Sequence, residues 1–557
     1  MTTTEITQQI TRPIRVSSTA VLDDAHVGDI RGALGTIRQG DIGERRGLGA
    51  KFKTLIAIVG PGLIVMVGDN DAGAFSTYAS AGQNYGTHLL WTLLLLVPVV
   101  YVNQEMVLRL GAVARVGHAR LILQRFGRFW GAFSVIDLFL LNALTIVTEF
   151  IGITIGLAYL GLPRLWGVLL AAACVIGAAS TGSFRRFERV CVFLCLASLL
   201  LVPILLMVHP SVGQMAHDFV VPGMPSGNLA SVMLLIIAIV GTTVAPWQLF
   251  FQQSYVIDKR ITPRFIRYER VDLWIGIVIV VVGAVAMMSF SAQAFAGTAG
   301  FGNFTDTAGV AAGLAHYAGH VAGVLFAIAL IDASIIGASA VSLSTAYAIG
   351  DLFAINHSLH RKPSQAKGFY AVFVGLVGLS AALVLIPDVP LGLVTNAVQA
   401  LAGVLLPSAS VFLLLLCNDK DVLGPWVNSR KVNVFTSAVI GVLVMLSIIL
   451  TASVLFPSIT DGQIIAIMVG FAVLGVLAGG GAAVWTRTHR RAVPIGVPVG
   501  EPVEYGDKWS WRMPPLAELG RPQLSAGRRL WLGVLRGYLV LAVAMVVIRV
   551  VQLAVGH

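Results

Sequence analysis

The chain has 557 residues, of which 57% are hydrophobic and only 12% are charged, and its mean hydropathy is +0.85. Soluble globular proteins do not have this composition, so we predict an all-α polytopic membrane protein whose surroundings are the lipid bilayer. The formal net charge is +11, but the basic residues lie in alternate loops between apolar segments, which argues against nucleic acid as a partner.

The N-terminal residues 1–50 contain basic residues but no apolar core, so they do not form a signal peptide. We expect a disordered cytoplasmic arm there. Beyond it, a span of about 20 apolar residues is needed to cross a bilayer. Thirteen segments of that kind follow, near residues 53–80, 87–111, 130–160, 163–181, 189–208, 229–256, 271–295, 321–350, 367–387, 390–416, 432–456, 462–486 and 530–554.

The loops between these segments indicate how the chain is oriented. With the N-terminus inside, the cytoplasmic loops collect nearly all the basic residues, whereas the opposite loops hold only Arg164. This asymmetry predicts a protein of the cell membrane with a cytoplasmic N-terminus. Residues 491–529 are polar and would form a cytoplasmic linker. The last segment, within 530–557, contains Arg536 and Arg549 and can be read as a span or as an interfacial helix.

The first span is interrupted by Gly68-Asp69-Asn70-Asp71-Ala72-Gly73. A carboxylate at mid-helix costs roughly 2.5–3.5 kcal/mol on insertion scales, so such residues indicate a functional site. The flanking glycines allow the backbone to unwind and to turn carbonyls and helix ends towards a cavity. The break predicts half of a cation site.

A second interrupted span lies five spans later, where Gly241, Thr242, Thr243 and Pro246 fall in mid-segment. Proline removes an intrahelical hydrogen bond and clashes with the preceding turn. Two breaks in corresponding positions of two five-helix halves predict an inverted-repeat transporter with its site between the breaks. The repeats would occupy residues 51–210 and 211–418, followed by accessory helices eleven and twelve at 419–490.

Asp71 is the strongest candidate ligand, because a hard divalent cation prefers carboxylate and carbonyl oxygens. The carbonyls near Gly68 and Thr242 would complement it. An alternative role, compatible with the first, is that Asp71 caps the second half-helix. Asp69 and Asn70 either line the site or hydrogen-bond locally.

Further polar residues could line the site. Gln248 follows the second break beside Trp247, and Gln399 lies in the tenth span. Glu149, in the third span, has either a structural or a transport role. No phosphate-binding loop, nucleophile triad or HExxH motif occurs in the sequence. We therefore expect neither an enzyme nor a bound cofactor, and no obligate protein partner.

Several of these motifs resemble the Nramp divalent-metal transporters, in order and spacing, over about residues 50–490. The similar stretches are Gly60-Pro61, Tyr85-Gly86 with Leu89-Leu90-Trp91, Thr148-Glu149-Phe150-Ile151-Gly152, Gly241 to Pro246, and Gln399 with Pro407. The resemblance implies a LeuT-like fold of five plus five helices, with helices 1 and 6 broken and two or three helices added at the C-terminus.

The sequence departs from the family pattern at the metal site. The family's Asp-Pro-Gly-Asn reads Asp71-Ala72-Gly73-Ala74, so the aspartate is kept and the asparagine is lost. The family's Met-Pro-His reads Ala245-Pro246-Trp247. A family aspartate in helix 3 is replaced by Ile146, and a second helix 6 histidine by Gln252.

These losses remove the soft sulfur ligand and the titratable groups associated with proton coupling. An all-oxygen site suits Mg²⁺, Ca²⁺ and Mn²⁺, and a wider site suits an ion that keeps several waters, as Mg²⁺ does. The combination is similar to the Nramp-related magnesium transporters and implies transport of Mg²⁺, and also Mn²⁺, by alternating access without proton coupling. Two alternatives are a proton-coupled Mn²⁺/Fe²⁺ symporter with Glu149 as proton acceptor, and a sodium-coupled organic-solute carrier of the same fold.

Overall fold

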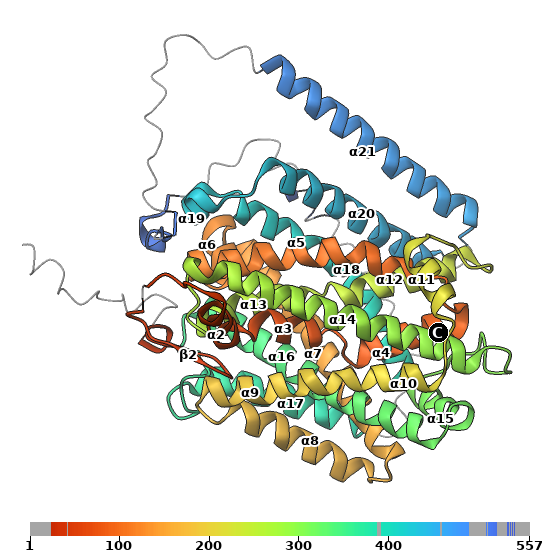
Figure 1. Ribbon diagram of the computed structural model, residues 1–557. Helices are drawn as coiled ribbons and strands as arrows, with labels where there is room; N and C mark the ends of the chain where they lie inside the picture. Colours follow the sequence, from red (N-terminus) through yellow and green to blue (C-terminus); the bar gives the residue numbers. More distant parts are fainter. Residues whose placement is uncertain are drawn as a thin grey trace, which may run out of the picture.

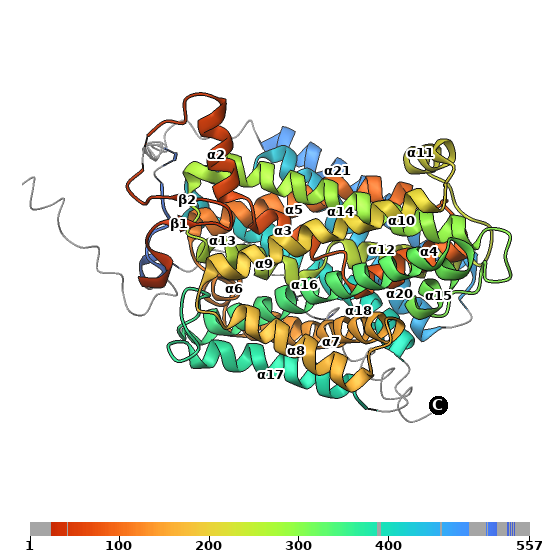
Figure 2. The same cartoon turned by 60° about the horizontal axis from the view of Figure 1, so that its bottom comes forward.

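The computed structural model describes residues 24–41, 43–386, 391–456, 459–489, 508–509 and 511–520, with isolated positions between 532 and 540. Figures 1 and 2 show long helices that run side by side. Helix α2 (Leu48–Ile58) and strand β2 (Thr36–Ile37) lie at one end of the bundle, and α11 (Val212–Val220) and α15 (Thr307–Tyr317) lie at the other. We name these the β2 end and the α15 end.

The first repeat begins with a span made of three helical pieces and continues through four further spans. Its helices are α2 (Leu48–Ile58), α3 (Pro61–Val67), α4 (Ala72–Tyr85), α5 (Trp91–Ala114), α6 (His118–Phe126), α7 (Arg128–Tyr159), α8 (Arg164–Ala179), α9 (Phe184–Ala197), η2 (Ser198–Leu200) and α10 (Leu201–Met207).

The second repeat follows the same order, with a broken first span, and short helices cover its ends. Its helices are α11 (Val212–Val220), α12 (Leu229–Thr243), α13 (Pro246–Asp258), η3 (Pro263–Phe265), α14 (Ile266–Phe295), α15 (Thr307–Tyr317), α16 (His320–Phe353), α17 (Lys367–Val384) and α18 (Leu391–Cys417). Beyond the repeats lie α19 (Lys420–Leu423), η4 (Gly424–Trp426), α20 (Arg430–Leu455), α21 (Asp461–His489) and η5 (Leu516–Glu518).

The predicted all-helical membrane architecture is confirmed. Among the described residues, eight helices are long and apolar enough to cross a membrane, or up to ten if two bent pairs are each one span. Two shorter apolar helices, Arg164–Ala179 and Asp461–Leu477, coincide with the fourth and twelfth predicted segments. The thirteenth, at 530–554, lies almost wholly outside the described residues.

The broken helices occupy the centre of the bundle. The first span packs through α3 and α4 along α14, and α7 packs along α16. All seven residues of α3 and all thirteen of α13 are buried. Since both broken spans are enclosed by other helices, their unwound backbone never faces lipid, which is the condition for such backbone at membrane depth.

The expectation of a disordered arm is wrong for residues 24–41. They contain η1 (Asp24–His26) and a hairpin in which β1 (Ile30–Arg31) pairs antiparallel with β2 (Thr36–Ile37). Ile30, Ala33 and Ile37 are buried against the bundle. The segment is rich in charged residues, and three apolar positions are too few to raise its mean hydropathy, so its packing was not predicted. Residues 1–23 of the expected arm lie outside the described part of the chain.

The predicted linker at 491–529 is partly described and contacts the bundle. Trp426 donates its indole N–H to the Lys508 carbonyl (2.9 Å), and Arg125 donates to the Gly520 carbonyl (2.6 Å). The ring of Trp509 lies 5.2 Å from that of Trp426. Within the described residues of this segment, Lys508 and Trp509 therefore contact η4, and Gly520 contacts α6.

Candidate metal centre

The break in the first span separates α3 from α4 by four residues, and Asp71 caps the second half. Its backbone is extended (φ −75°, ψ −176°), and its Oδ1 accepts a hydrogen bond from the Ala74 N–H (2.9 Å). An aspartate at this position satisfies one of the free N–H groups at a helix start. The capping role is thus realised, and the carboxylate is held at the helix end.

The break in the sixth span comprises Val244, which is non-helical (φ −132°, ψ 83°), and Ala245, which is extended, before α13 begins at Pro246. Proline has no N–H, so the Thr242 carbonyl, which would accept from residue 246 in a continuous helix, loses that partner. The Thr242 hydroxyl is buried and, within the described residues, has no hydrogen-bond partner. The C-terminal end of α12 therefore offers oxygens at the break.

The three polar residues of the first break point in three directions. Asn70 donates its amide to the Val280 carbonyl of α14 (3.2 Å). Asp69 accepts a hydrogen bond from the Gln248 side chain of α13. Asp71 lies near Glu149 of α7 and Gln399 of α18. The structure therefore separates the Asn70 side chain from Asp71.

Gln399 of α18 lies directly beside the Asp71 helix end. A Cβ atom added at Gly73 would overlap the Gln399 amide and stand 3.2 Å from the Asp71 Oδ1. The backbone carbonyl of Gln399 lies against Gly241 of α12, where an added Cβ would be 2.8 Å away. Gln399 is thus placed between the two broken spans, and glycine at 73 is what makes room for its side chain.

Glu149 of α7 is the second acidic group beside Asp71. Its Oε2 accepts a hydrogen bond from the Ala72 N–H (3.2 Å), so this carboxyl group lies at the start of α4, one residue from Asp71. The other oxygen, Oε1, is buried and has no partner among the described residues. Two buried carboxyl groups at one helix start repel each other when both are ionised, so a proton or a cation beside them is favoured.

Gln248 connects the two breaks to the second span. Its amide N–H donates to Asp69, and its carbonyl oxygen accepts from the Gln104 side chain of α5 (2.9 Å). The remaining Asp69 oxygen, Oδ2, is buried without a partner in the described residues. Gln104 was not among the predicted site residues, although three consecutive polar residues in an apolar span, Asn103-Gln104-Glu105, indicate a possible buried polar contact.

Trp247 fills space rather than lining the centre with polar atoms. Its ring lies beside Gly68, where an added Cβ would stand 3.5 Å from the Trp247 Cη2, and only 1% of the residue is exposed. Its carbonyl accepts from the Ser344 hydroxyl of α16 (2.9 Å). The indole packs between the first break and α16.

The donors around Asp71 are oxygens, supplied by carboxyl, amide and carbonyl groups. Ala74 and Ala245 contribute only backbone. In the described part of the chain, no three His, Cys, Asp or Glu side chains are grouped closely enough to enclose a metal ion. The C-terminal ends of α3 and α12 carry partial negative charge, which favours a cation between them. The arrangement suits an ion held by few charges and several neutral oxygens.

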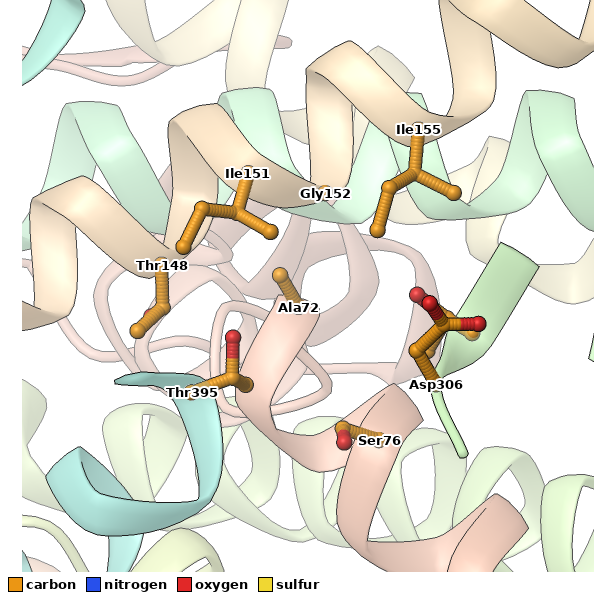
Figure 3. Close-up of a pocket in the computed structure, with 9 residues that line it drawn as sticks. Ala72, Ser76, Thr148, Ile151, Gly152, Ile155, Asp306 and Thr395 are labelled. Carbon is orange, nitrogen blue, oxygen red and sulfur yellow. The ribbon is translucent and has the colours of Figure 1, made fainter. Parts of the chain in front are cut away.

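A pocket lies beside this centre, towards the α15 end. Its lining comes from α4, α7, α18 and the start of α15, as Figure 3 shows with Ala72, Gly152, Thr395 and Asp306. Towards the β2 end, the buried helices α3 and α13 close the path. The pocket thus ends at Ala72 and Thr148, next in sequence to Asp71 and Glu149, and Asp71 itself is only 4% exposed. Thr395 was another residue that sequence reasoning missed, because an isolated threonine in an apolar span carries no signal.

Comparisons with known proteins agree with these features. The family model described as "Natural resistance-associated macrophage protein-like", or Nramp, matches residues 62–453. A "Divalent metal cation transporter MntH" of Ralstonia nicotianae is 28% identical over 404 residues, which are 70% of this chain and 88% of that protein. The protein of the same name from Latilactobacillus sakei is 28% identical over 274 residues, 46% of this chain and 58% of its own length.

The fold is similar to a solved structure. The Eremococcus coleocola manganese transporter has a TM-score of 0.61 at 20% sequence identity, covering 81% of this chain and 98% of that one. At this identity the likeness establishes the fold, which is that of a LeuT-like inverted repeat with two broken spans.

Proposed function

The chain belongs to the Nramp family and is a divalent metal cation transporter, and from this premise we propose that it carries Mg²⁺, and also Mn²⁺, by alternating access without proton coupling. Asp71 binds the ion directly or through water. The Thr242 and Gly68 carbonyls and the Gln399 amide contribute neutral oxygens. Asp69 and Gln248 add polar lining, Ala74 and Ala245 leave space, and the Asn70 side chain is not a ligand.

The observation that carries this proposal is the oxygen-only surroundings of Asp71. Sulfur ligands favour soft transition metals, whereas carboxylate, carbonyl and water oxygens suit Mg²⁺ and Mn²⁺. Alanine at 74 and 245 removes two side chains from the centre, which leaves room for retained waters. Mg²⁺ dehydrates reluctantly and usually keeps several of them.

The absence of proton coupling is supported by the residues at three positions. Ile146, Trp247 and Gln252 do not titrate, and both polar ends of the buried Gln252 side chain have no partner among the described residues. No coupled ion is needed energetically. A divalent cation entering across 100 mV gains about 4.6 kcal/mol, twice the single-charge value of roughly 2.3, which corresponds to a concentration ratio of roughly 10³.

A proton-coupled transition-metal symporter is the second candidate, and one observation favours it. The Glu149 carboxyl accepts a hydrogen bond from the Ala72 N–H, next to Asp71, so metal binding at Asp71 would favour release of a proton from Glu149. If that proton leaves on the cytoplasmic side, metal entry carries protons inward with it.

We also propose that the protein resides in the cell membrane with its N-terminus, and hence the β2 end, in the cytoplasm, on the basis of the basic loops.

The test is Mg²⁺ uptake into proteoliposomes by the wild type and by Asp71→Asn. Asp332→Asn is the matched control, because Asp332 is also a buried carboxyl in a membrane helix but bonds to Ser198 (3.2 Å). We expect Asp71→Asn to abolish uptake and Asp332→Asn to keep it. No Mg²⁺ uptake by the wild type, or full uptake by Asp71→Asn, would refute the proposal. Sodium-dependent uptake of an organic solute that survives Asp71→Ala would instead favour a solute carrier.

A further inference from the structure

The kink between α2 and α3 is held by two buried charges from other helices. The two helices meet at 53°. Lys259, which follows α13, donates from Nζ to the Val59 carbonyl (3.0 Å) and the Ile58 carbonyl at the end of α2. Asp272 of α14 accepts from the N–H groups of Gly62 (2.7 Å), Gly60 (3.1 Å) and Leu63 (3.3 Å) at the start of α3. A cation at a helix C-terminus and an anion at a helix N-terminus both match the helix dipole.

Glu188 of α9 extends this arrangement to the N-terminal hairpin. Its Oε1 pairs with the Lys259 ammonium (2.7 Å), and its Oε2 accepts from the Ala33 N–H at the hairpin turn (2.6 Å). Glu188 and Ala33 are fully buried, and Lys259 is 1% exposed. One continuous chain of hydrogen bonds therefore runs from the hairpin through Glu188 and Lys259 to the end of α2.

Four arginines from three spans bind backbone carbonyls of residues 24–37. Arg185 donates to the Gly32 and Gly35 carbonyls (2.9 and 3.0 Å), and Arg189 donates to the Ala33 carbonyl (2.8 Å). Arg260 binds the Ala25 and Asp29 carbonyls, and Arg115 binds the His26 carbonyl (2.9 Å). Because these arginines lie on α9 and after α13 and α5, the hairpin joins three spans at the β2 end (Figure 2).

The hairpin also fits closely against α2. A Cβ atom added at Gly35 would stand 2.7 Å from the Ala57 Cβ and 2.9 Å from its Cα. A larger side chain at 35 would therefore push the hairpin off α2, since the obstacle includes backbone that does not yield.

The contacted elements are those that close the metal centre towards the β2 end. Both α3 and α13 are inner halves of broken spans, and such halves can move about their breaks while the rest of the bundle stays in place.

The closed state also contains one energetically unfavourable feature, a buried carboxyl group without a hydrogen-bond partner. Both Glu269 oxygens are buried beside Asp272 and, in the described part of the chain, have no hydrogen-bond partner. An unpaired buried carboxyl is unfavourable, and separating α14 from α3 would hydrate it.

We propose that residues 24–37 and the Glu188–Lys259–Asp272 cluster form an inner latch that holds α3 in place and keeps the metal centre closed at the β2 end. Lys259 and Asp272 are positioning residues, because they act on the centre through α3 rather than by touching the ion. The inner latch rests on the transport function proposed above, in that its release would open the centre towards the cytoplasm.

Hydrogen exchange of the full-length protein in lipid nanodiscs tests the inner latch. The readout is exchange in the segment 57–67, whose Gly60, Gly62 and Leu63 amides donate to Asp272. We compare the wild type with Arg185→Ala/Arg189→Ala, which removes the contacts to the hairpin turn, and with Gly35→Val, which displaces the hairpin from α2. We expect about tenfold faster exchange in 57–67 for both variants, which corresponds to about 1.4 kcal/mol, with residues 72–85 unchanged.

Arg186→Ala is the matched control, since Arg186 lies between the two arginines in sequence but, unlike them, makes no hydrogen bond to the hairpin carbonyls among the described residues. Its exchange should equal that of the wild type. Wild-type exchange of 57–67 in both latch variants, or an equal increase in 57–67 and 72–85, would overturn the proposal, because the second result means general destabilisation. Failure of the proposed function would give a different result. The wild type would transport no Mg²⁺, while hydrogen exchange in 57–67 would still be faster in the two latch variants than in the wild type.

Discussion

At the scale of residues, the centre depends on how an unwound backbone distributes three consecutive polar side chains. Asp71 faces Glu149 and Gln399, Asp69 bonds to Gln248, and Asn70 bonds to the Val280 carbonyl of α14. In a regular helix, successive residues are turned by a fixed angle, but a break removes that constraint. Only one of the two carboxylates is therefore placed beside Gln399.

Ala245 tests the role of ligand softness. Replacing it by methionine adds a thioether at the second break, where alanine is buried at 7% exposure. Soft ligands favour transition metals, so we expect the preference for Mn²⁺ over Mg²⁺ to rise by about tenfold, or about 1.4 kcal/mol. Competition between the two ions in proteoliposome uptake measures it.

The control for this substitution is Ala245→Leu, which adds a side chain of similar size without sulfur. It should reduce uptake of both ions without changing their ratio. An equal change of the ratio in the leucine and methionine variants would show that size, not softness, sets the preference.

Gln248 tests the hydrogen-bonded connection between the breaks. Gln248→Leu leaves the buried Asp69 without its hydrogen-bond donor, and losing a partner of a buried polar group costs about 1–3 kcal/mol. We expect a lower free energy of unfolding, measured in detergent by denaturant titration. Because Gln104 bonds to the same side chain (2.9 Å), Gln104→Leu combined with Gln248→Leu should cost less than the sum of the single changes. Strict additivity would contradict a coupled connection.

At this scale the sequence indicated the polar break and Asp71, and it named Gln248, Gln399 and Glu149 as residues that could line the site, but it did not indicate which groups bond to one another. Asp71 was recognisable because a carboxylate in an apolar span is costly. Gln104, Thr395 and the direction of Asn70 depend on how distant spans pack, and no local pattern encodes that. Asp272 and the Glu188–Lys259 pair likewise lie near the ends of apolar spans, where charged residues are common. Their burial could therefore not be predicted from the sequence.

At the scale of elements, hydrophobic length and helix-breaking residues determined most of what could be predicted. Twelve apolar segments coincide with helices, and the two predicted breaks occur where Gly, Asp and Pro interrupt them. The extra kink at Val59–Gly60 and the N-terminal hairpin were not predicted. Both are held by contacts with α9, α13 and α14, and tertiary contacts of this kind leave little trace in local composition.

The loop between α16 and α17 provides a pH-dependent contact at the β2 end. His357 is buried, and its ring nitrogens face the Ile355 carbonyl (2.7 Å) and the Asp351 carboxylate (3.2 Å). Both partners are acceptors, so only the protonated ring donates to both. Burial opposes that charge, but the Asp351 hydrogen bond and charge outweigh it, and the pKa of His357 is raised above 6.5. His26, Tyr347 and Asp258 also face this ring.

A raised pKa in the folded state means that the contact stabilises the protein fully below pH 6.5 and is lost as the pH rises through the folded-state pKa. We therefore expect the thermal stability of the wild type to fall over this range more steeply than that of His357→Gln. Thermal unfolding in detergent at pH 6.0 to 8.5, roughly the range in which histidine titrates, measures the difference. Parallel curves for the two proteins would contradict the assignment.

At the scale of the whole molecule, the fold places one buried centre between two half-spans, with a pocket beside it towards the α15 end and the buried helices α3 and α13 towards the β2 end. The membrane potential alone can drive a divalent ion inward, so such a centre needs no second ion for uptake. The choice between an uncoupled carrier and a proton symporter then depends on the Asp71–Glu149 pair and on whether its proton leaves with the metal.

The most direct measurement records Mg²⁺ and pH together inside proteoliposomes, with an inside-negative potassium diffusion potential imposed. Our account predicts Mg²⁺ entry that follows the potential, with no change of internal pH, and the same behaviour for Mn²⁺. Acidification of the interior in proportion to the metal that enters, or entry of Mn²⁺ without any Mg²⁺, would contradict it.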